Sequence, residues 1–300
     1  MINYQIIQKR NIWLTFSGIL FVVFGLALLI WGFRYGIDFT GGSLLEIRFP
    51  SQRPTVSQIQ EQLADLKLNS LIIQPVGSQE MILRFQETTE EKHQAILAKI
   101  NELIKDGEKV EEIRFESVGP SIGDELKRKA IYAIAFVLIA ILIYITYAFR
   151  KVSKPVASWK YGTAALVAML HDAIITMGIF AILGKFLNLE INTPFVAAIL
   201  TVLGYSVHDS IVVFDRIREN LPRSDEDFEG TVNTSLNQTL VRSINTSLTS
   251  ILVLLAIIFF GGASIRSFVL ALAIGIFIGT YSSIFVASPI LVIWEKLGKK

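Results

Sequence analysis

The chain has 300 residues, of which 52% are hydrophobic and 18% charged, and its mean hydropathy is +0.53. This balance lies outside that of soluble domains and indicates a membrane protein. The absence of cysteine excludes a disulfide framework, a thiolate metal site and a cysteine nucleophile. A net charge of +2 with no large basic patch argues against a nucleic-acid partner.

Six apolar runs reach the length of about 20 residues that a helix needs to cross a bilayer. The first follows Lys9 and Arg10, as a signal peptide would, but it is too long and lacks a cleavage pattern. We therefore expect it to be a retained transmembrane helix. The six predicted spans are residues 12–33, 130–149, 161–183, 193–214, 242–260 and 266–294.

The short loops predict the orientation of these spans. An even number of spans places both termini on one side, where most basic loop residues also fall, whereas the opposite short loops hold only Lys185 and Arg266. Because basic loops stay in the cytoplasm, we expect both termini, including residues 1–11, to be cytoplasmic. The loop 215–241 falls on the same side, and its acidic residues after Pro222 look like the start of a solvated helix.

The segment 34–129, between the first two spans, is the one large soluble insert and falls on the extracytoplasmic side. Its alternating apolar residues and its helical periodicity follow one another in the order βαββαβ. This order predicts a ferredoxin-like α+β domain, with another small α+β domain as the alternative. The predicted strands are 43–49, 71–76, 81–85 and 110–118, and the predicted helices are 55–66 and 91–104.

Ionisable side chains within the predicted spans require an explanation, because each costs about 2.5–3.5 kcal/mol on insertion scales. They are His171, Asp172, His208, Asp209 and Arg242. Helical spacing places Asp209 on a polar stripe of the fourth span and Arg242 on a polar stripe of the fifth. We therefore predict that these two helices face each other and that Asp209 pairs with Arg242.

Exchange of this arginine for a proton at Asp209 is the chemistry of a proton relay. The alternative is a static ion pair that holds two helices together. His171, Asp172 and His208 are further relay candidates, for which a buried structural contact is the competing explanation. A carboxylate beside arginine and histidine favours protons over sodium as the coupling ion.

Motifs for catalysis or metal binding are absent from the sequence. There is no H-E-x-x-H or G-x-S-x-G, and Gly41-Gly42 precedes a strand instead of a helix, which disfavours a nucleotide site. Asp172 and Asp209 would supply the two aspartates of a membrane protease, but Asp209 lacks a Gly-x-Gly-Asp context. We expect no enzymatic activity, no metal and no cofactor other than the proton gradient.

Four separated segments resemble the SecF family of bacterial protein-export membrane subunits. They are residues 36–42 (GIDFTGG), 117–123 (SVGPSIG), 204–221 (GYSVHDSIVVFDRIRENL) and 233–249 (NTSLNQTLVRSINTSLT). The resemblance implies a subunit that pairs with SecD to form a twelve-span body of the resistance-nodulation-division type in the cytoplasmic membrane. This body would use the proton-motive force to assist the SecYEG channel, with YajC and YidC as further partners and an unfolded preprotein as substrate.

The same resemblance assigns roles to individual residues. It maps the essential membrane aspartate of the family onto Asp209 and its arginine onto Arg242, and it departs at His208, where many relatives carry asparagine. The family motif includes Gly36, Asp38, Gly41 and Gly42, which are candidates for a hinge or for a plain turn. The alternative function is half of a proton-coupled small-molecule antiporter from the same superfamily.

Overall fold

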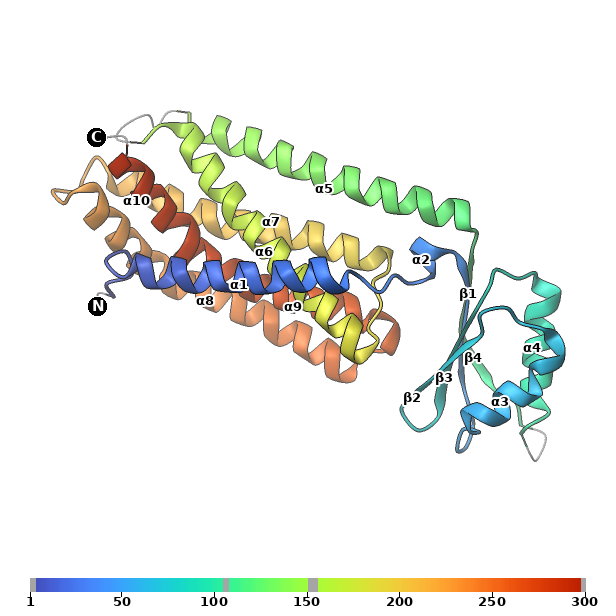
Figure 1. Ribbon diagram of the computed structural model, residues 1–300. Helices are drawn as coiled ribbons and strands as arrows, with labels where there is room; N and C mark the ends of the chain where they lie inside the picture. The colour runs from blue at the N-terminus through green and yellow to red at the C-terminus, as the bar shows by residue number, and fades with distance from the viewer. Residues whose placement is uncertain (1–3, 105–107, 151–155, 298–300) are drawn as a thin grey trace. The chain divides into compact units, whose positions relative to one another are not determined.

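The computed structural model describes residues 4–104, 108–150 and 156–297. The chain divides into two compact units, a helical unit of Met1–Arg34 with Ala130–Lys300 and a sheet unit of Tyr35–Lys129 (Figure 1). Each unit has its own hydrophobic core. The predicted fold class, a helical membrane protein with a ferredoxin-like sheet domain, is confirmed by the elements described below.

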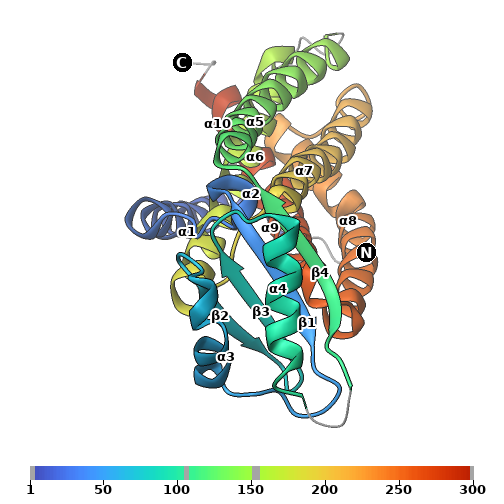
Figure 2. The ribbon, with the colours of Figure 1, turned by 90° about the vertical axis from the view of Figure 1, so that its right-hand side faces the viewer.

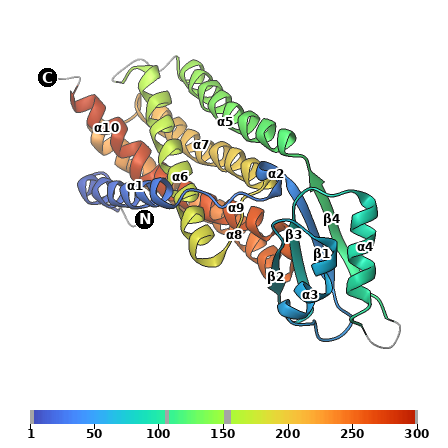
Figure 3. The same cartoon turned by 45° about the vertical axis from the view of Figure 1, so that its right-hand side comes forward.

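Six helical stretches within the described residues are long and apolar enough to span a membrane. The last of them is interrupted by a π-helical turn, η2, and Figure 3 shows α10 continuing the line of α9 beyond it. The elements are α1 (Arg10–Trp31), α5 (Pro120–Ala148), α6 (Ser158–Leu187), α7 (Thr193–Asn220), α8 (Phe228–Phe260), α9 (Ala263–Ser282), η2 (Ser283–Ala287) and α10 (Ser288–Leu297).

Two of these helices, α5 and α8, begin much earlier than the apolar runs predicted. α5 begins at Pro120, whose fixed backbone suits the first turn of a helix. α8 begins at Phe228, after Asp227 accepts a hydrogen bond of 2.8 Å from the backbone N–H of Gly230. The predicted loop 215–241 is therefore mostly helical, because apolar runs mark only the part of a helix that matches lipid and miss its polar turns.

The helices of the helical unit differ in how much of their surface is covered. Half or more of the apolar stretch is buried in α6, in α7 and in the final helix containing α9, whereas about a tenth or less is buried in α1, α5 and α8. The three covered helices therefore form the centre of the unit. The other three expose large apolar side chains at its periphery, as helices in contact with lipid do.

Glycine brings two pairs of helices into close contact. A Cβ atom at Gly178 of α6 would lie 2.2 Å from the carbonyl oxygen of Phe24 in α1. A Cβ atom at Gly275 of α9 would lie 2.2 Å from a methyl group of Val202 in α7. No side chain fits at either point, so these contacts depend on glycine, as is common where membrane helices cross.

The sheet unit has four antiparallel strands in the order β2-β3-β1-β4, which together with two helices gives the ferredoxin-like βαββαβ topology. Figure 2 shows α3 and α4 on the same face of the sheet. Leu45, Ile47, Met81 and Leu83 from the central strands pack beneath them. The elements are β1 (Gly42–Arg48), α3 (Val56–Gln62), β2 (Ile72–Val76), β3 (Glu80–Phe85), α4 (Glu90–Asn101) and β4 (Glu111–Val118).

A short helix that the sequence did not predict, α2 (Ile37–Thr40), leads into β1. Gly41 ends it with φ +73°, and a Cβ atom there would lie 2.8 Å from the Cα of Pro120. Gly42 follows with φ +122°, and its Cβ would lie 2.9 Å from the carbonyl oxygen of Phe85. The two glycines are therefore required by both backbone conformation and close packing. The hinge role of Gly36, Asp38 and this glycine pair stays a prediction.

We predict that Gly41→Ala destabilises the sheet unit, since it combines backbone strain of about 1–3 kcal/mol with displacement of Pro120. Hydrogen exchange of the β1 amides in the full-length protein should become faster. Gly77→Ala is the matched control, because Gly77 also has a positive φ (+55°) but nothing lies within 4 Å of its Cβ position. Equal effects of the two substitutions would show that packing against Pro120 is unimportant.

Candidate functional site

Asp209 lies in the core of the helical unit, on α7, and is 7% exposed. Ser243 of α8 donates a hydrogen bond of 2.6 Å to its Oδ1 atom. Ser283, the first residue of η2, donates a hydrogen bond to its Oδ2 atom. Hydroxyl groups from two neighbouring elements therefore hold this carboxylate.

Asp172 of α6 is a second, fully buried carboxylate. Its Oδ2 atom accepts hydrogen bonds of 2.6 Å from Ser206 of α7 and from Ser282 at the end of α9. Its Oδ1 atom lies 2.9 Å from Nδ1 of His171. Serine hydroxyls therefore surround both buried carboxylates: those of α7 and α9 bind Asp172, and those of α8 and η2 bind Asp209.

His171 is buried against aromatic rings. Its ring stacks on Phe21 of α1 and on Tyr281 of α9, with centroid distances of 6.4 and 6.5 Å. The Tyr281 hydroxyl lies 2.8 Å from the Ser17 hydroxyl. Within the described part of the chain, the Nε2 atom of His171 has no hydrogen-bond partner, so its tie to Asp172 is the polar contact that orients the ring.

The predicted ion pair between Asp209 and Arg242 is not formed among the described residues. Arg242 is exposed on α8, and both carboxylate oxygens of Asp209 accept serine hydroxyls. Around Arg242, the buried polar side chains of α8 are those of Thr239, Ser243 and Ser247. One residue turns a helix by about 100°, so the predicted stripe through Arg242 lies to the side of this face. The roles of both residues in ion coupling stay predictions.

His208 is also exposed, whereas the serines that bind Asp209 are buried. The stripe of α7 predicted to face α8 contains Thr201, Tyr205, His208, Asp209 and Val212. The prediction is correct for Tyr205, whose hydroxyl donates to Ser247 of α8 at 3.1 Å. Thr201 and His208 of that stripe are exposed instead. The structure thus brings Asp209 and Asp172 into one region with serines, and leaves His208 and Arg242 on the surface of the unit.

The chemistry of this region follows from its donors. A carboxylate held only by neutral hydroxyl groups takes up a proton without the loss of a buried ion pair. Within residues 4–104, 108–150 and 156–297 there is no group of three or more His, Asp or Glu side chains that would hold a metal ion. The hydroxyl groups around Asp209 are compatible with either protonation state of its carboxylate, because a hydroxyl both donates and accepts hydrogen bonds.

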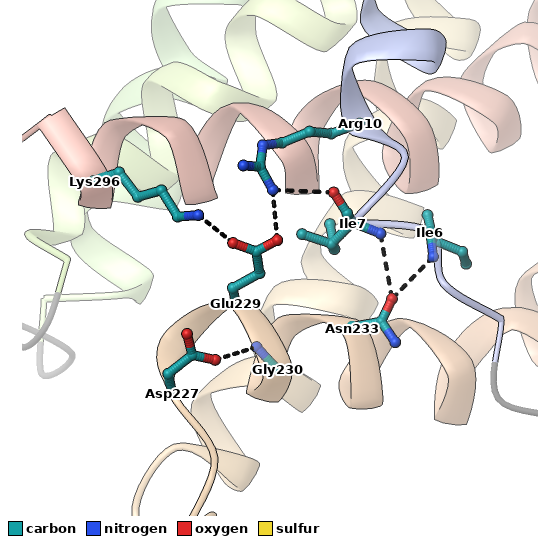
Figure 4. A network of polar contacts seen from close by, with 8 residues as sticks. All are labelled: Ile6, Ile7, Arg10, Asp227, Glu229, Gly230, Asn233 and Lys296. Atoms are coloured by element: carbon teal, nitrogen blue, oxygen red, sulfur yellow. Dashed lines mark hydrogen bonds and ion pairs between the residues drawn. The ribbon is translucent and has the colours of Figure 1, made fainter.

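A second polar network ties the chain's first described residues to α8 and α10 (Figure 4). Glu229 accepts from Arg10 at 2.5 Å and also pairs with Lys296. The Oδ1 atom of Asn233 accepts the backbone N–H groups of Ile6 and Ile7 at 3.0 and 3.2 Å. The sequence suggested only the helix start beside Glu229, because nothing local indicates a partner more than 200 residues away.

Six apolar helices around two buried carboxylates, with a ferredoxin-like unit after the first helix, define a polytopic membrane protein with an ionisable core. The sequence matches two family descriptions: "Protein export membrane protein SecD/SecF, C-terminal" over residues 98–297 and "SecD/SecF GG Motif" over residues 27–49. The chain therefore belongs to the SecD/SecF family of protein export membrane proteins.

Curated relatives carry the name protein translocase subunit SecF. The relative from Thermobaculum terrenum is 46% identical over 97% of this chain and 94% of its own length. That from Haemophilus influenzae is 39% identical over 95% of this chain and 84% of its own length. The crystal structure of SecDF from Thermus thermophilus, described as a translocon-associated membrane protein, superposes with a TM-score of 0.82 at 34% identity. It covers 98% of this chain, and this chain spans 39% of it.

We predict that Asn233→Ala loosens the segment that precedes α1, because two buried N–H groups lose their acceptor at about 1–3 kcal/mol each. Hydrogen exchange of the Ile6 and Ile7 amides should become faster. Asn245→Ala is the control, since this exposed asparagine lies on the same helix away from the network. Unchanged exchange at Ile6 and Ile7 would contradict the assigned role of Asn233.

Proposed function

We propose that the chain is a SecF-like subunit that acts with SecD and uses the proton-motive force to assist Sec-dependent translocation of unfolded preproteins. The observation that carries this proposal is the buried, hydroxyl-bound carboxylate of Asp209 on a membrane-spanning helix of a translocase family. The proposed setting is the bacterial cytoplasmic membrane, with both termini cytoplasmic and residues 34–129 outside. SecYEG, YajC and YidC are the further proposed partners.

The need for a partner is supported by polar side chains on the surface of the spanning helices. Arg242, Asn245 and Thr249 share one exposed face of α8. A charged group that meets lipid alone is costly, so a counter-charge from outside this chain would stabilise Arg242. We propose that this face of α8 lies against SecD and that SecD supplies the carboxylate for Arg242.

The energy available from one proton limits the work that such a subunit performs. A unit charge that crosses 100 mV releases about 2.3 kcal/mol. A folded domain is stable by about 5–15 kcal/mol. The energy of a single proton is therefore enough to bias a movement of helices or to hold a translocating segment, but not to unfold a domain. We propose that the substrate arrives unfolded.

The proposed coupling step takes place at the hydroxyl contacts of Asp209. A proton that enters from outside neutralises the carboxylate and weakens its charge-assisted hydrogen bonds to Ser243 and Ser283. Because these serines belong to α8 and η2, the contact between α7 and both elements changes with each proton. The sheet unit, which is inserted between α1 and α5, would carry the movement to the substrate side.

We propose that this role is not enzymatic. In a membrane aspartyl protease the two carboxylates share a water between them, whereas here each carboxylate accepts serine hydroxyls from neighbouring helices. These donors leave the carboxylates suited to proton exchange and not to attack on a peptide.

We predict that Asp209→Asn abolishes proton-driven stimulation of export while the protein remains in the membrane. The asparagine is isosteric and cannot bind the proton. The measurement is the export rate of a secretory precursor in cells whose only copy carries the substitution, with membrane abundance determined in parallel. Asp215→Asn is the matched control on the same helix, since Asp215 is half-exposed and pairs locally with Arg218. Normal export with Asp209→Asn would exclude the relay.

We predict that SecD protects the polar face of α8 from chemical labelling. The cysteine-free chain allows single substitutions, and Thr249→Cys and Leu248→Cys lie at the same depth on different sides of the exposed surface of α8. A membrane-permeable maleimide should label Thr249→Cys in the chain alone and much less in membranes that contain SecD. Labelling of Leu248→Cys should change little, and equal protection at both sites would contradict the proposed orientation.

A further inference from the structure

Two consecutive serines bind the two buried carboxylates. Ser282 donates to Asp172 at 2.6 Å, and Ser283 donates to Asp209. Neighbouring residues of a helix point about 100° apart, which allows one turn of chain to reach α6 and α7 together. The end of α9 therefore joins the two carboxylates, although they belong to different helices.

Each of these serine hydroxyls has a second acceptor within reach. Ser282 Oγ lies 3.1 Å from the carbonyl oxygen of Gly279, and Ser283 Oγ lies 3.0 Å from that of Thr280. A hydroxyl group carries one hydrogen and two lone pairs, so it donates to one acceptor at a time. Each serine is thus able to donate either to its aspartate or to its own helix.

This choice accommodates both protonation states of the aspartates. An ionised carboxylate accepts the serine hydrogen. A neutral carboxylic acid donates its own O–H to the serine Oγ, and the serine hydrogen turns to the backbone carbonyl. One O–H bond forms on the carboxylate, none breaks in the protein, and no buried donor is left without an acceptor.

The remaining ligands of the two carboxylates are arranged in the same way. Each aspartate accepts one further hydroxyl from a neighbouring helix: Ser206 of α7 for Asp172 and Ser243 of α8 for Asp209, both at 2.6 Å. Ser206 precedes Asp209 by three residues, so the two lie on one face of α7. The two carboxylates therefore share both α7 and the serine pair.

The π-helical turn begins at the second of these serines. η2 spans Ser283–Ala287, and the hydroxyl of Ser288 donates to the carbonyl oxygen of Ser283 at 3.2 Å. Such turns are rare and occur mostly at functional sites, where they interrupt the regular helix. The widened turn therefore begins where Ser282 and Ser283 bind the two carboxylates, between α9 and α10.

We infer that Asp172 is a second proton-binding carboxylate of the Asp209 site, and that Ser282 and Ser283 are positioning residues that hold both aspartates in either protonation state. The inference rests on the proposed proton coupling and extends it to a second group. It requires no metal and no further reactant, because a proton is the only ligand.

Few other charged groups lie near this pair in the described residues. α6 contributes His171 beside Asp172, and α7 contributes the exposed His208. α8 contributes the exposed Arg242. The neighbouring residues of α1, α9 and η2 that contact the site are hydroxyl-bearing, aromatic or aliphatic. His171 is thus the titratable side chain in direct contact with the site, through Oδ1 of Asp172.

Infrared difference spectroscopy during acid titration tests this inference on the full-length protein, isolated with its membrane partners and placed in lipid vesicles. Protonation of a buried aspartate produces a carboxylic C=O stretching band. Among the carboxylic bands we expect one that is lost in Asp172→Asn and another that is lost in Asp209→Asn. Ser282→Ala should move only the Asp172 band to higher wavenumber, and Ser283→Ala only the Asp209 band, because each acid loses the acceptor of its O–H.

Ser288→Ala is the matched control, since it also removes a buried hydroxyl of this helix but one that binds only backbone. It should move neither band. The inference is overturned if the isosteric Asp172→Asn removes no band, or if Ser282→Ala has no more effect than the control.

Export measurements on the same variants separate this inference from the proposed function. One outcome is that Asp209→Asn loses export while Asp172→Asn removes no band. This outcome would retain the proposed function and overturn the inference. The other outcome is that Asp172→Asn and Asp209→Asn each remove a band while export stays normal in both variants. This outcome would support the two-carboxylate site and overturn the proposed function.

Discussion

The cost of a carboxylate in a membrane interior determines the arrangement of the central helices. Asp172 and Asp209 are buried within the spanning helices, and a buried carboxylate needs hydrogen-bond donors from the protein around it. Serines on α7, α8, α9 and η2 supply them, and a serine side chain reaches only about one hydrogen-bond length beyond its own helix. The position and rotation of four elements around α6 therefore depend on two aspartates.

The sheet unit depends on a different constraint, the close approach of its two ends. Gly41, which precedes β1, lies against Pro120, which follows β4 and opens α5. Gly123 completes this contact, because a Cβ there would lie 3.1 Å from the backbone of Phe39. The segment that enters the unit and the segment that leaves it are thus held together.

Much of this structure follows from patterns in the sequence. The period-two and helical segments predict the ferredoxin-like unit correctly because its strands and helices are short and each carries its own signal. The insertion cost of an ionisable group indicates Asp172 and Asp209 without any knowledge of the fold. The partner of Asp209 was predicted wrongly, because arginine is the obvious counter-ion and the choice between Arg242 and Ser243 turns on the rotation of one helix.

Ser282 and Ser283 were missed because serine is common in membrane helices, where it often bonds its own backbone. Two adjacent serines in the last apolar run were the signal available in the sequence. Their significance depends on η2, and a π-helical turn has no local sequence pattern as clear as a cap or a hairpin. Tertiary geometry supplies this information.

The glycine contacts limit how such a bundle moves. Separation of α1 from α6 at Gly178, or of α7 from α9 at Gly275, would open gaps that no side chain at those positions fills. Rotation about these points would keep the backbones in contact. It would mainly change the hydrogen bonds between serines and aspartates that lie farther along the helices. In the proposed proton-coupled movement the two glycines would act as pivots, and the displacement would grow with distance along each helix from its pivot.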